Sequence, residues 1–321
     1  MDRRTFLAAT ASVGWGLPTA PAVAQPGPAG LPRELRIGFQ KSGVLLIAKQ
    51  QGLFEQRFKP LGVEVKWTEF QFGPPLLEAL NVGSIDYGPT GDAPPIFAQA
   101  ARANLYYAAA NESAGNGSAI LLPAHSPIRT LGDLKGKRIG FARASSAHNL
   151  TIEAIEKAGI GYADFTPVYL PPADARAAFE RGAIDAWTIW DPYFAIAEKI
   201  PGTRILSLSR GIVAQNSYFL ANRGFTDRHP AVVAVINAEL AKVAAWADGH
   251  RGDVAILLAQ ATGLDRESWQ RAIDRTEFAV GPVSEAAIAE QQRVADRFHR
   301  LGLIPRPINI REIVWTWVPK A

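Results

Sequence analysis

The chain contains two similar halves. The segment "RIGFQKSG" begins at Arg36 and "RIGFARAS" begins at Arg138, while "GSIDYGPTGDAPPIFA" begins at Gly83 and "GAIDAWTIWDPYFAIA" begins at Gly182. The two matched pairs occur in the same order and about 100 residues apart, a spacing that indicates an internal repeat. The repeat predicts two lobes built on one plan. In each lobe a strand leads through a polar turn into a helix, and a later Gly-x-Ile-Asp strand ends in a loop that carries an aspartate.

Helices and strands alternate along both repeats, as in a doubly wound α/β sheet flanked by helices. We expect a strand at 35–40, a helix at 44–58 and a second strand at 63–70. A crossing strand at 218–221 and a strong helix at 230–249 return the chain to the first lobe. The predicted segments are a signal peptide at 1–24, a discontinuous lobe 1 at 33–118 and 220–321, and a lobe 2 at 119–219.

Composition excludes several classes of function. The 321 residues are 48% hydrophobic, enough for two lobes with their own cores. The chain has no cysteine, which excludes disulfides, a thiolate nucleophile and cysteine-bound metals. The net charge of +4 is scattered, so we expect no nucleic-acid partner. The five histidines are dispersed and form no H-E-x-x-H pattern, and we predict no metal or other cofactor.

The N-terminus has the pattern of an export signal. Arg3 and Arg4 precede Phe6-Leu7, and Ala22-Val23-Ala24 provides an A-x-A cleavage site. Paired arginines followed by this dipeptide resemble a twin-arginine signal. We therefore predict a periplasmic protein whose mature chain begins near Gln25. No later segment has 18 uncharged apolar residues, so we expect no membrane span.

The segment "SSAHN" at 145–149 lies between a predicted strand and a predicted helix. Helix N-termini have unpaired N–H groups and a partial positive charge, so small polar residues there favour an anion site. The alternative is that Ser145 or Ser146 only caps the helix. Ligands of open α/β sheets bind at the carboxyl ends of the strands. We therefore expect four segments to line a cleft between the lobes, namely 40–43, 90–92, 145–149 and 190–191.

Three motifs resemble a known family. "TGD" at 90–92, "SSAHN" at 145–149 and "IWDPY" at 189–193 are similar to those of periplasmic aliphatic sulfonate-binding proteins of ABC importers. The resemblance runs from about Leu35 to Trp317. It implies a type II-like periplasmic binding protein fold and a hinge that closes on an alkyl sulfonate. It also implies a monomer that delivers the sulfonate to an inner-membrane permease for sulfur acquisition.

A sulfonate is a permanent anion with three acceptor oxygens, so it requires several donors in one concave place. Ser145 and Ser146 are the first candidates, and Trp190, Phe39 and Tyr193 are candidates to cover the alkyl chain, although Trp190 could also be core. The predicted ligand-binding residues are Gln40, Lys41, Ser42, Thr90, Gly91, Asp92, Glu112, Ser145, Ser146, Ala147, His148, Asn149, Trp190 and Asp191. Among them, the backbone N–H groups of Ala147 and His148, the backbone at Gly91 and the Gln40 amide are expected to donate.

Several of these residues have a structural alternative. Asp92 and Asp191 would repel an anion, and we expect them to hold loops or cap helices. His148 either contacts the ligand or braces its helix. Lys41 is either a counter-charge or solvated. Glu112 either meets an amine on the ligand, as in a taurine binder, or faces solvent.

Two other functions compete with alkyl sulfonate binding. The same receptor class could take taurine, nitrate or another small organic anion. An enzyme on this scaffold is the second alternative, but the desulfinases that resemble these receptors rely on a cysteine, which this chain lacks. A serine hydrolase with Ser145 or Ser146 and His148 is disfavoured, because residues two or three apart at a helix start do not readily form a nucleophile–base pair. We predict a binding protein and no enzymatic activity.

Overall fold

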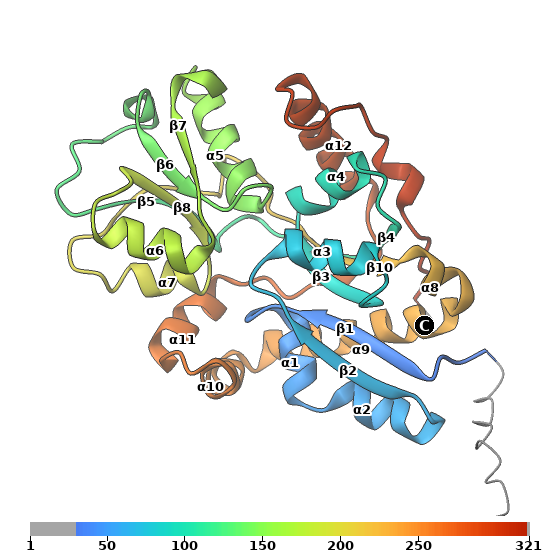
Figure 1. The fold of residues 1–321 in the computed structure, drawn as a ribbon. Coiled ribbons are helices and arrows are strands. Elements are labelled where there is room, and N and C mark those ends of the chain that lie inside the picture. Colours follow the sequence, from blue (N-terminus) through green and yellow to red (C-terminus); the bar gives the residue numbers. More distant parts are fainter. Residues whose placement is uncertain (1–29, 320–321) are drawn as a thin grey trace, which may run out of the picture.

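The computed structural model describes residues 30–319 and contains two mixed β-sheets, each flanked by helices (Figure 1). The prediction of an α/β fold with two helix-flanked sheets is confirmed. The signal peptide predicted at 1–24 lies outside the described residues.

The first sheet has six strands in the order β11-β4-β10-β3-β1-β2. β1 pairs in parallel with β2 and β3, whereas β10 runs antiparallel to β3 and β4. This antiparallel strand is the crossing strand predicted at 218–221. The strands are β1 (Glu34–Phe39), β2 (Glu64–Glu69), β3 (Tyr87–Gly91), β4 (Leu105–Asn111), β10 (Ser217–Asn222) and β11 (Val280–Gly281).

The second sheet has five strands in the order β7-β6-β8-β5-β9. Its strands are β5 (Ser118–Leu122), β6 (Arg138–Phe141), β7 (Thr166–Tyr169), β8 (Ala186–Trp190) and β9 (Arg204–Leu208). We call the elements built on the two sheets the first half and the second half. The chain passes between the halves twice, at 112–117 and at 209–216.

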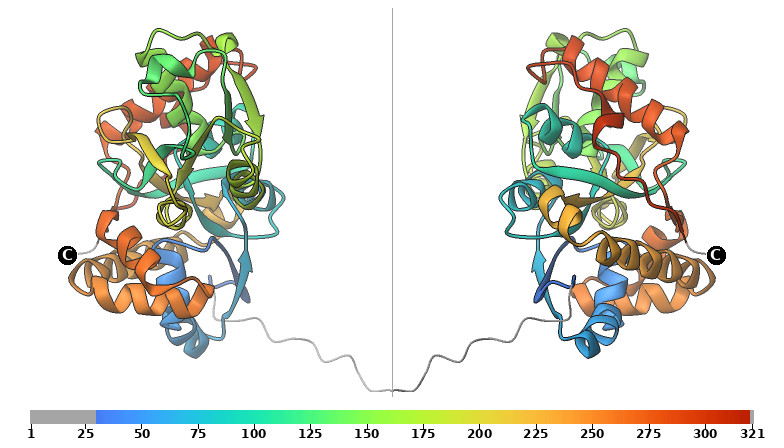
Figure 2. Two further views of the ribbon diagram at one scale, coloured as in Figure 1. Left: turned by 90° about the vertical axis from the view of Figure 1, so that its left-hand side faces the viewer. Right: turned by 90° about the vertical axis from the view of Figure 1, so that its right-hand side faces the viewer.

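The helices after β10 return to the first half, where α9 and α10 lie beside α1 (Figure 2). The helices of the first half are α1 (Val44–Gln50), α2 (Leu53–Phe58), α3 (Gly73–Asn81), α4 (Ala93–Ala100), α8 (Arg223–Arg228), α9 (Pro230–Gly249), α10 (Arg251–Thr262), α11 (Arg266–Arg275) and α12 (Glu285–Arg300). Those of the second half are α5 (Ser146–Lys157), α6 (Pro172–Glu180) and α7 (Tyr193–Ala197). Short 3₁₀ turns occupy Lys59–Leu61, Leu131–Leu134, Tyr162–Asp164 and Ile310–Ile313.

The single helix predicted at 44–58 is wrong. Gly52 lies between α1 and α2 with φ of 62°, a left-handed conformation that interrupts the helix. Glycine adopts this conformation without the steric cost that a side chain brings.

Helix α9 is long and apolar enough to cross a membrane by composition, and it is the one such helix within residues 30–319. Its buried face, with Val233, Ile236 and Leu240, packs into the core of the first half. Asn237 on that face accepts a 2.6 Å hydrogen bond from Tyr87 Oη. These contacts are those of a core helix.

The repeated Arg and Asp form the same clamp in both halves. In the first half, the backbone N–H of Arg36 donates to Asp86 Oδ2 at 2.8 Å, and the guanidinium contacts both carboxylate oxygens. In the second half, Arg138 makes the same three contacts with Asp185. Each clamp joins an arginine in the N-terminal half of a strand to the residue before the parallel neighbour of that strand.

The repeated Gly and Ile residues make a second contact beside each clamp. A Cβ added at Gly38 would lie 2.6 Å from Ile85 Cδ1, and one added at Gly140 would overlap Ile184. The isoleucine that precedes each clamp aspartate therefore packs directly on the strand backbone. The repeat that we identified in the sequence encodes how each strand pair begins, at the end of the sheet opposite the strand carboxyl ends.

His148 lies in an aromatic cluster that joins the two halves. Its ring stacks on Phe141 at 5.0 Å and on Phe298 and Phe97 at 5.9 and 6.2 Å between centroids. Phe97 is in α4 and Phe298 in α12, both in the first half. His148 is 1% exposed, so the alternative that it braces its helix describes its place in the structure.

The polar atoms of His148 are satisfied within the protein. Nδ1 accepts a hydrogen bond from the Ala144 N–H at 3.3 Å, and Nε2 lies 2.9 Å from Tyr162 Oη. Burial, with a smaller contribution from the charge of Arg143, lowers the pKa of His148 from 6.5 to about 3. The ring is therefore neutral at physiological pH.

We predict that Asp86→Ala destabilises the protein more than Asp185→Ala. The Asp86 side chain is 2% exposed and that of Asp185 is 32% exposed, so water can replace more of the second clamp. The loss of charge-assisted bonds at Asp86 is expected to cost about 2 kcal/mol. Urea unfolding of both variants measures the difference, and equal losses would contradict the role of burial.

The buried His148 also leads us to predict that the free energy of unfolding depends on pH. Its folded pKa lies below its unfolded pKa, so its contribution is complete above pH 6.5 and falls as the pH drops toward 3. We expect a loss of about 1.4 kcal/mol per pH unit in that window. His148→Phe removes the titrating group, so the stability difference between wild type and variant narrows as the pH falls from 6 to 4.

Urea unfolding at several pH values measures this effect. The control variant is His125→Gln, because His125 is exposed and outside the aromatic cluster. Parallel profiles for wild type and His148→Phe would contradict a buried neutral histidine.

Candidate functional site

A cavity of about 240 Å³ lies between the two halves, at the carboxyl ends of the strands. Of the predicted residues, Gln40, Ser42, Thr90, Gly91, Ser145, Ser146, Trp190 and Asp191 line it. The structure thus brings together residues from all four predicted segments. This is the place at which ligands of open α/β sheets bind.

The floor of the cavity crosses the first sheet. Ser217 of β10 pairs with Gly91 of β3 on one side and with Asn111 of β4 on the other, and Asn111 pairs with Val280 of β11. Neighbouring strands are about 4.8 Å apart, so the row from Gly91 to Asn111 spans about 10 Å. Gly91 marks one end of this floor, and the segment before β11 marks the other.

Helix α5 begins at the Gly91 end. Ser145 is its N-cap residue, but the Ser145 hydroxyl donates to the Ala142 carbonyl at 2.7 Å and does not cap the helix. The backbone N–H groups of Ser146 and Ala147 therefore have no side-chain cap. The N–H of His148 is already used, since it donates to the Ser145 carbonyl at 3.0 Å. The helix end offers donors and a partial positive charge to an anion.

Asp92 joins the halves beside this helix end. It caps α4 by accepting the Ala93 N–H at 2.8 Å, and Asn149 Nδ2 of α5 donates to its other oxygen at 2.7 Å. The Ser146 hydroxyl also hydrogen-bonds to Asp92. Burial raises the pKa of Asp92, and these hydrogen bonds oppose the rise. The Ser146 O–H group is thus directed at Asp92, and Asp92 and Asn149 do not line the cavity.

Side chains of the first half also have internal partners. Gln40 Nε2 donates to the Pro89 carbonyl at 2.9 Å, and Thr90 Oγ1 donates to the Gly91 carbonyl at 3.0 Å. Gln215 Nε2 is buried without a hydrogen-bond partner among the residues described, and Gln215 lines the cavity. Gln215 therefore adds an unused donor that we did not predict from the sequence.

Other predicted residues lie away from the cavity. Lys41 is half exposed and pairs with Glu69 at 3.3 Å, and Glu112 is exposed, so solvent satisfies both charges. The Ala147 side chain packs in the core of the second half, and His148 lies in the aromatic cluster. Of the apolar candidates, Phe39 and Tyr193 pack in cores, and only Trp190 lines the cavity.

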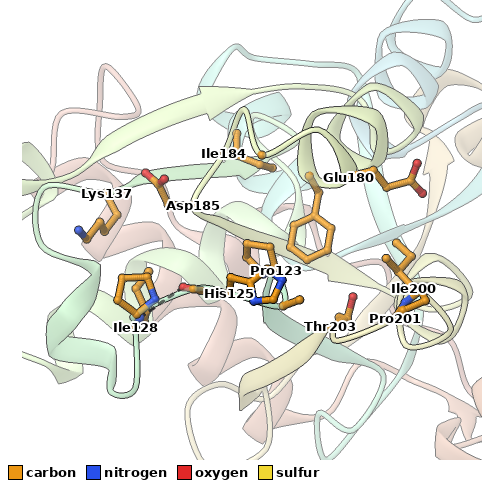
Figure 3. A pocket seen from close by; sticks show the side chains of 15 residues that line it. Pro123, His125, Ile128, Lys137, Glu180, Ile184, Asp185, Ile200, Pro201 and Thr203 are labelled. Carbon is orange, nitrogen blue, oxygen red and sulfur yellow. Dashed lines mark hydrogen bonds between the residues drawn. The ribbon is translucent and has the colours of Figure 1, made fainter.

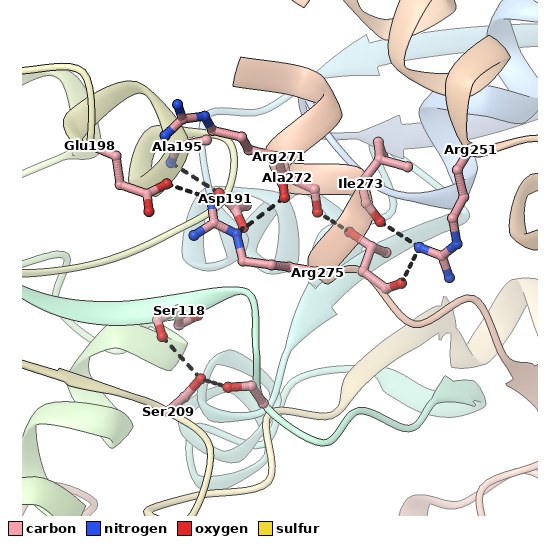
Figure 4. A network of polar contacts seen from close by, with 12 residues as sticks. Ser118, Asp191, Ala195, Glu198, Ser209, Arg251, Arg271, Ala272, Ile273 and Arg275 are labelled. Atoms are coloured by element: carbon pink, nitrogen blue, oxygen red, sulfur yellow. Dashed lines mark hydrogen bonds and ion pairs between the residues drawn. The ribbon is translucent and has the colours of Figure 1, made fainter. Parts of the chain in front are cut away.

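Asp191 belongs to a buried ion-pair network (Figure 4). Arg275 of α11 contacts Asp191 Oδ2 at 3.1 Å and Glu198 Oε2 at 2.6 Å, and its guanidinium lies 3.9 Å from the Phe194 ring centroid. Burial raises the pKa of Asp191 to about 7, opposed by the charge of Arg275 and by a hydrogen bond from the Ala195 N–H. The expectation that Asp191 holds its loop fits these contacts. Arg275 lines the cavity, but its guanidinium is already paired with two carboxylates.

Sequence reasoning missed the part of the lining that comes from the two crossings with the adjoining strand residues and from the segment that starts at Arg275, the last residue of α11. Neither region has a counterpart in the repeat, and only the strand at 218–221 provided a signal. The missed residues include Asn111, Ser113, Gln215, Asn216, Ser217, Phe219, Arg275, Thr276, Glu277 and Phe278.

A second cavity of about 390 Å³ lies in the second half (Figure 3). Lys137 and Asp185 on its wall precede β6 and β8, so it is at the opposite end of the sheet from the start of α5. Asp185 is already committed to Arg138. Within residues 30–319 no group of three or more His, Asp or Glu residues could hold a metal ion.

Comparison with known proteins places this geometry in a family. Residues 29–261 match the NMT1-like family. A protein of Escherichia coli K12 named for binding aliphatic sulfonates is 40% identical over 88% of this chain and 89% of its own, and one of Bacillus subtilis 168 with the same name is 32% identical over 90% and 88%. The alkanesulfonate-binding protein SsuA from Xanthomonas axonopodis pv. citri bound to MOPS is 40% identical, with a TM-score of 0.85 over 88% of this chain and 98% of its own. The chain therefore belongs to the NMT1-like family and is a homologue of these binding proteins.

Proposed function

We propose that this protein is an exported receptor that binds an aliphatic sulfonate between its halves and delivers it to an ABC importer. The observation that carries the proposal is the uncapped start of α5 at one end of a cavity whose walls include Trp190, Phe219 and Phe278. A sulfonate at this helix end would accept the free N–H groups, and its alkyl chain would lie along the aromatic walls.

The α5 end of the cavity suits the single negative charge of a sulfonate. Arg275 is the only cationic side chain in the described lining, and Asp191 and Glu198 neutralise it. The donors at the α5 end are uncharged. Each charge-assisted hydrogen bond contributes about 1.5–3 kcal/mol, so three or four are sufficient for micromolar binding after the cost of closure. The names of the relatives and the MOPS-bound neighbour support the same ligand class.

We further propose that the halves are the two lobes predicted at 33–118 with 220–321 and at 119–219. The bounds shift slightly, because Ser118 belongs to the second sheet and residues 217–219 of β10 belong to the first. The lobes would close about the two crossings between the sheets, and the permease would recognise the closed form. Export by the twin-arginine route, a periplasmic monomer and a role in sulfur acquisition complete the proposal. We assign it no enzymatic activity.

Calorimetric titration of the ligand-free mature chain from Gln25 tests the function. The panel of ligands is ethanesulfonate, octanesulfonate, taurine, sulfate and nitrate. We expect micromolar affinity for the two alkyl sulfonates and weak binding of sulfate and nitrate. The reason is that the cavity offers neutral donors for one charge and aromatic walls for an alkyl chain. Binding of taurine alone, or of nitrate alone, would replace the alkyl sulfonate with that ligand. No binding across the panel would reject the proposed function.

Gly91 provides a test of closure. An added Cβ at Gly91 would overlap Ser146 Oγ of the other half, so Gly91→Ala keeps the halves from approaching. We expect affinity for ethanesulfonate to fall at least about tenfold, the loss of one good hydrogen bond or more. The solution scattering curve should also stay that of a more open molecule when ligand is added.

The control is Gly281→Ala, because a Cβ at Gly281 would meet nothing within 4 Å. Wild-type affinity and compaction in Gly91→Ala would contradict a ligand-linked contact between Gly91 and Ser146.

A further inference from the structure

The geometry points to a second recognition subsite in the cavity, which binds a cationic group on the sulfonate through Glu277. This inference rests on the proposed function and narrows its ligand class. The preferred ligand would be a zwitterion, with a sulfonate at the α5 end and a substituted ammonium group at the Glu277 end.

Glu277 is held at the far end of the cavity floor. Asn111 Nδ2 donates to the Glu277 carbonyl at 2.9 Å, and Asn111 Oδ1 accepts the Ala279 N–H at 3.0 Å. The segment before β11 is therefore tied to the end of β4, about 10 Å from Gly91 along the row of paired strands. Glu277 lines the cavity there.

The Glu277 carboxylate has no cationic partner among the residues described. Its Oε2 accepts a hydrogen bond from the Ala114 N–H, which leaves Oε1 for another group. The adjacent Arg275 is committed to Asp191 and Glu198. Glu277 is outside this ion-pair network, so no cationic side chain among the residues described balances its negative charge. An alkyl chain alone would bring no compensating charge to this end of the cavity.

The apolar wall is suited to the same cation. Trp190 and Phe219 line the cavity, and aromatic rings attract substituted ammonium groups through their negative faces. The neighbouring Phe278 already has a cation at its ring, since Arg251 lies 5.5 Å from its centroid. A carboxylate beside aromatic rings recognises an ammonium group more strongly than it recognises a hydrocarbon.

Two isosteric probes separate charge from shape. The first is 3-(trimethylammonio)propane-1-sulfonate, a permanent zwitterion, and the second is 4,4-dimethylpentane-1-sulfonate, in which carbon replaces the nitrogen. Calorimetry on the mature wild-type protein should show that the zwitterion binds at least about tenfold more tightly, the effect of one charge-assisted contact.

The variant Glu277→Gln tests whether Glu277 causes the preference for the zwitterion. Glutamine can still accept the Ala114 N–H, so thermal unfolding should match that of the wild type. We expect the preference for the zwitterion to fall to less than about threefold. Glu112→Gln is the matched control, because Glu112 is exposed and outside the cavity lining, and it should keep the full preference.

Three outcomes would overturn the inference. Equal affinity of the wild type for both probes would remove the cationic subsite. A preference that survives in Glu277→Gln, or one that is lost in Glu112→Gln, would remove Glu277 from it. Failure of the wild type to bind either probe or ethanesulfonate would instead reject the proposed function, and the inference with it.

Discussion

The site depends on one buried contact between the halves. The Asp92 carboxylate at the start of α4 accepts hydrogen bonds from Asn149 and Ser146 at the start of α5. Gln291 of α12 donates to the Asp92 backbone carbonyl at 2.5 Å, which also fixes the position of the residue that precedes α4. A buried carboxylate is costly unless its oxygens are satisfied, so the two helix starts are fixed relative to one another. The N–H groups of α5 are thereby directed at the cavity.

Ion pairs between the halves add to this contact. Arg297 of α12 contacts Glu153 and Glu156 of α5, and Arg275 of α11 contacts Asp191 and Glu198 of the second half. The aromatic cluster around His148 fills the space between α4, α5 and α12. Polar and aromatic contacts at such an interface can be broken and remade, which suits a receptor that opens and closes.

The sequence predicted the fold and the cavity lining well in the segments that belong to the repeat. The matched Arg-Ile-Gly and Ile-Asp segments predicted two sheets of one plan, and the structure explains them through the clamps at Arg36 and Arg138. The carboxyl ends of the repeated strands and the segments that follow them supplied eight lining residues, including Trp190 and Ser146. The apolar pattern continues across Gly52, so it predicted one helix where the structure has two. The left-handed conformation of Gly52 separates them.

The rest of the site could not be predicted from local patterns. His148 was a candidate because it is polar at a helix start, but its ring points into packing made by Phe97 and Phe298, which are distant in sequence. Arg275 and Glu277 lie in a segment without a repeat counterpart, and only the return of the C-terminal helices brings them to the cavity. Glu112, for which the sequence left a ligand amine and solvent as alternatives, is exposed.

A crystal structure of the mature protein with octanesulfonate tests the central claim most directly. We predict sulfonate oxygens within hydrogen-bonding distance of the Ser146 and Ala147 N–H groups, with the Asp92–Asn149 contact intact and the alkyl chain against Trp190. A sulfonate bound in the second cavity near Lys137, or one held in the cleft by Arg275 with Asp191 displaced, would contradict this account.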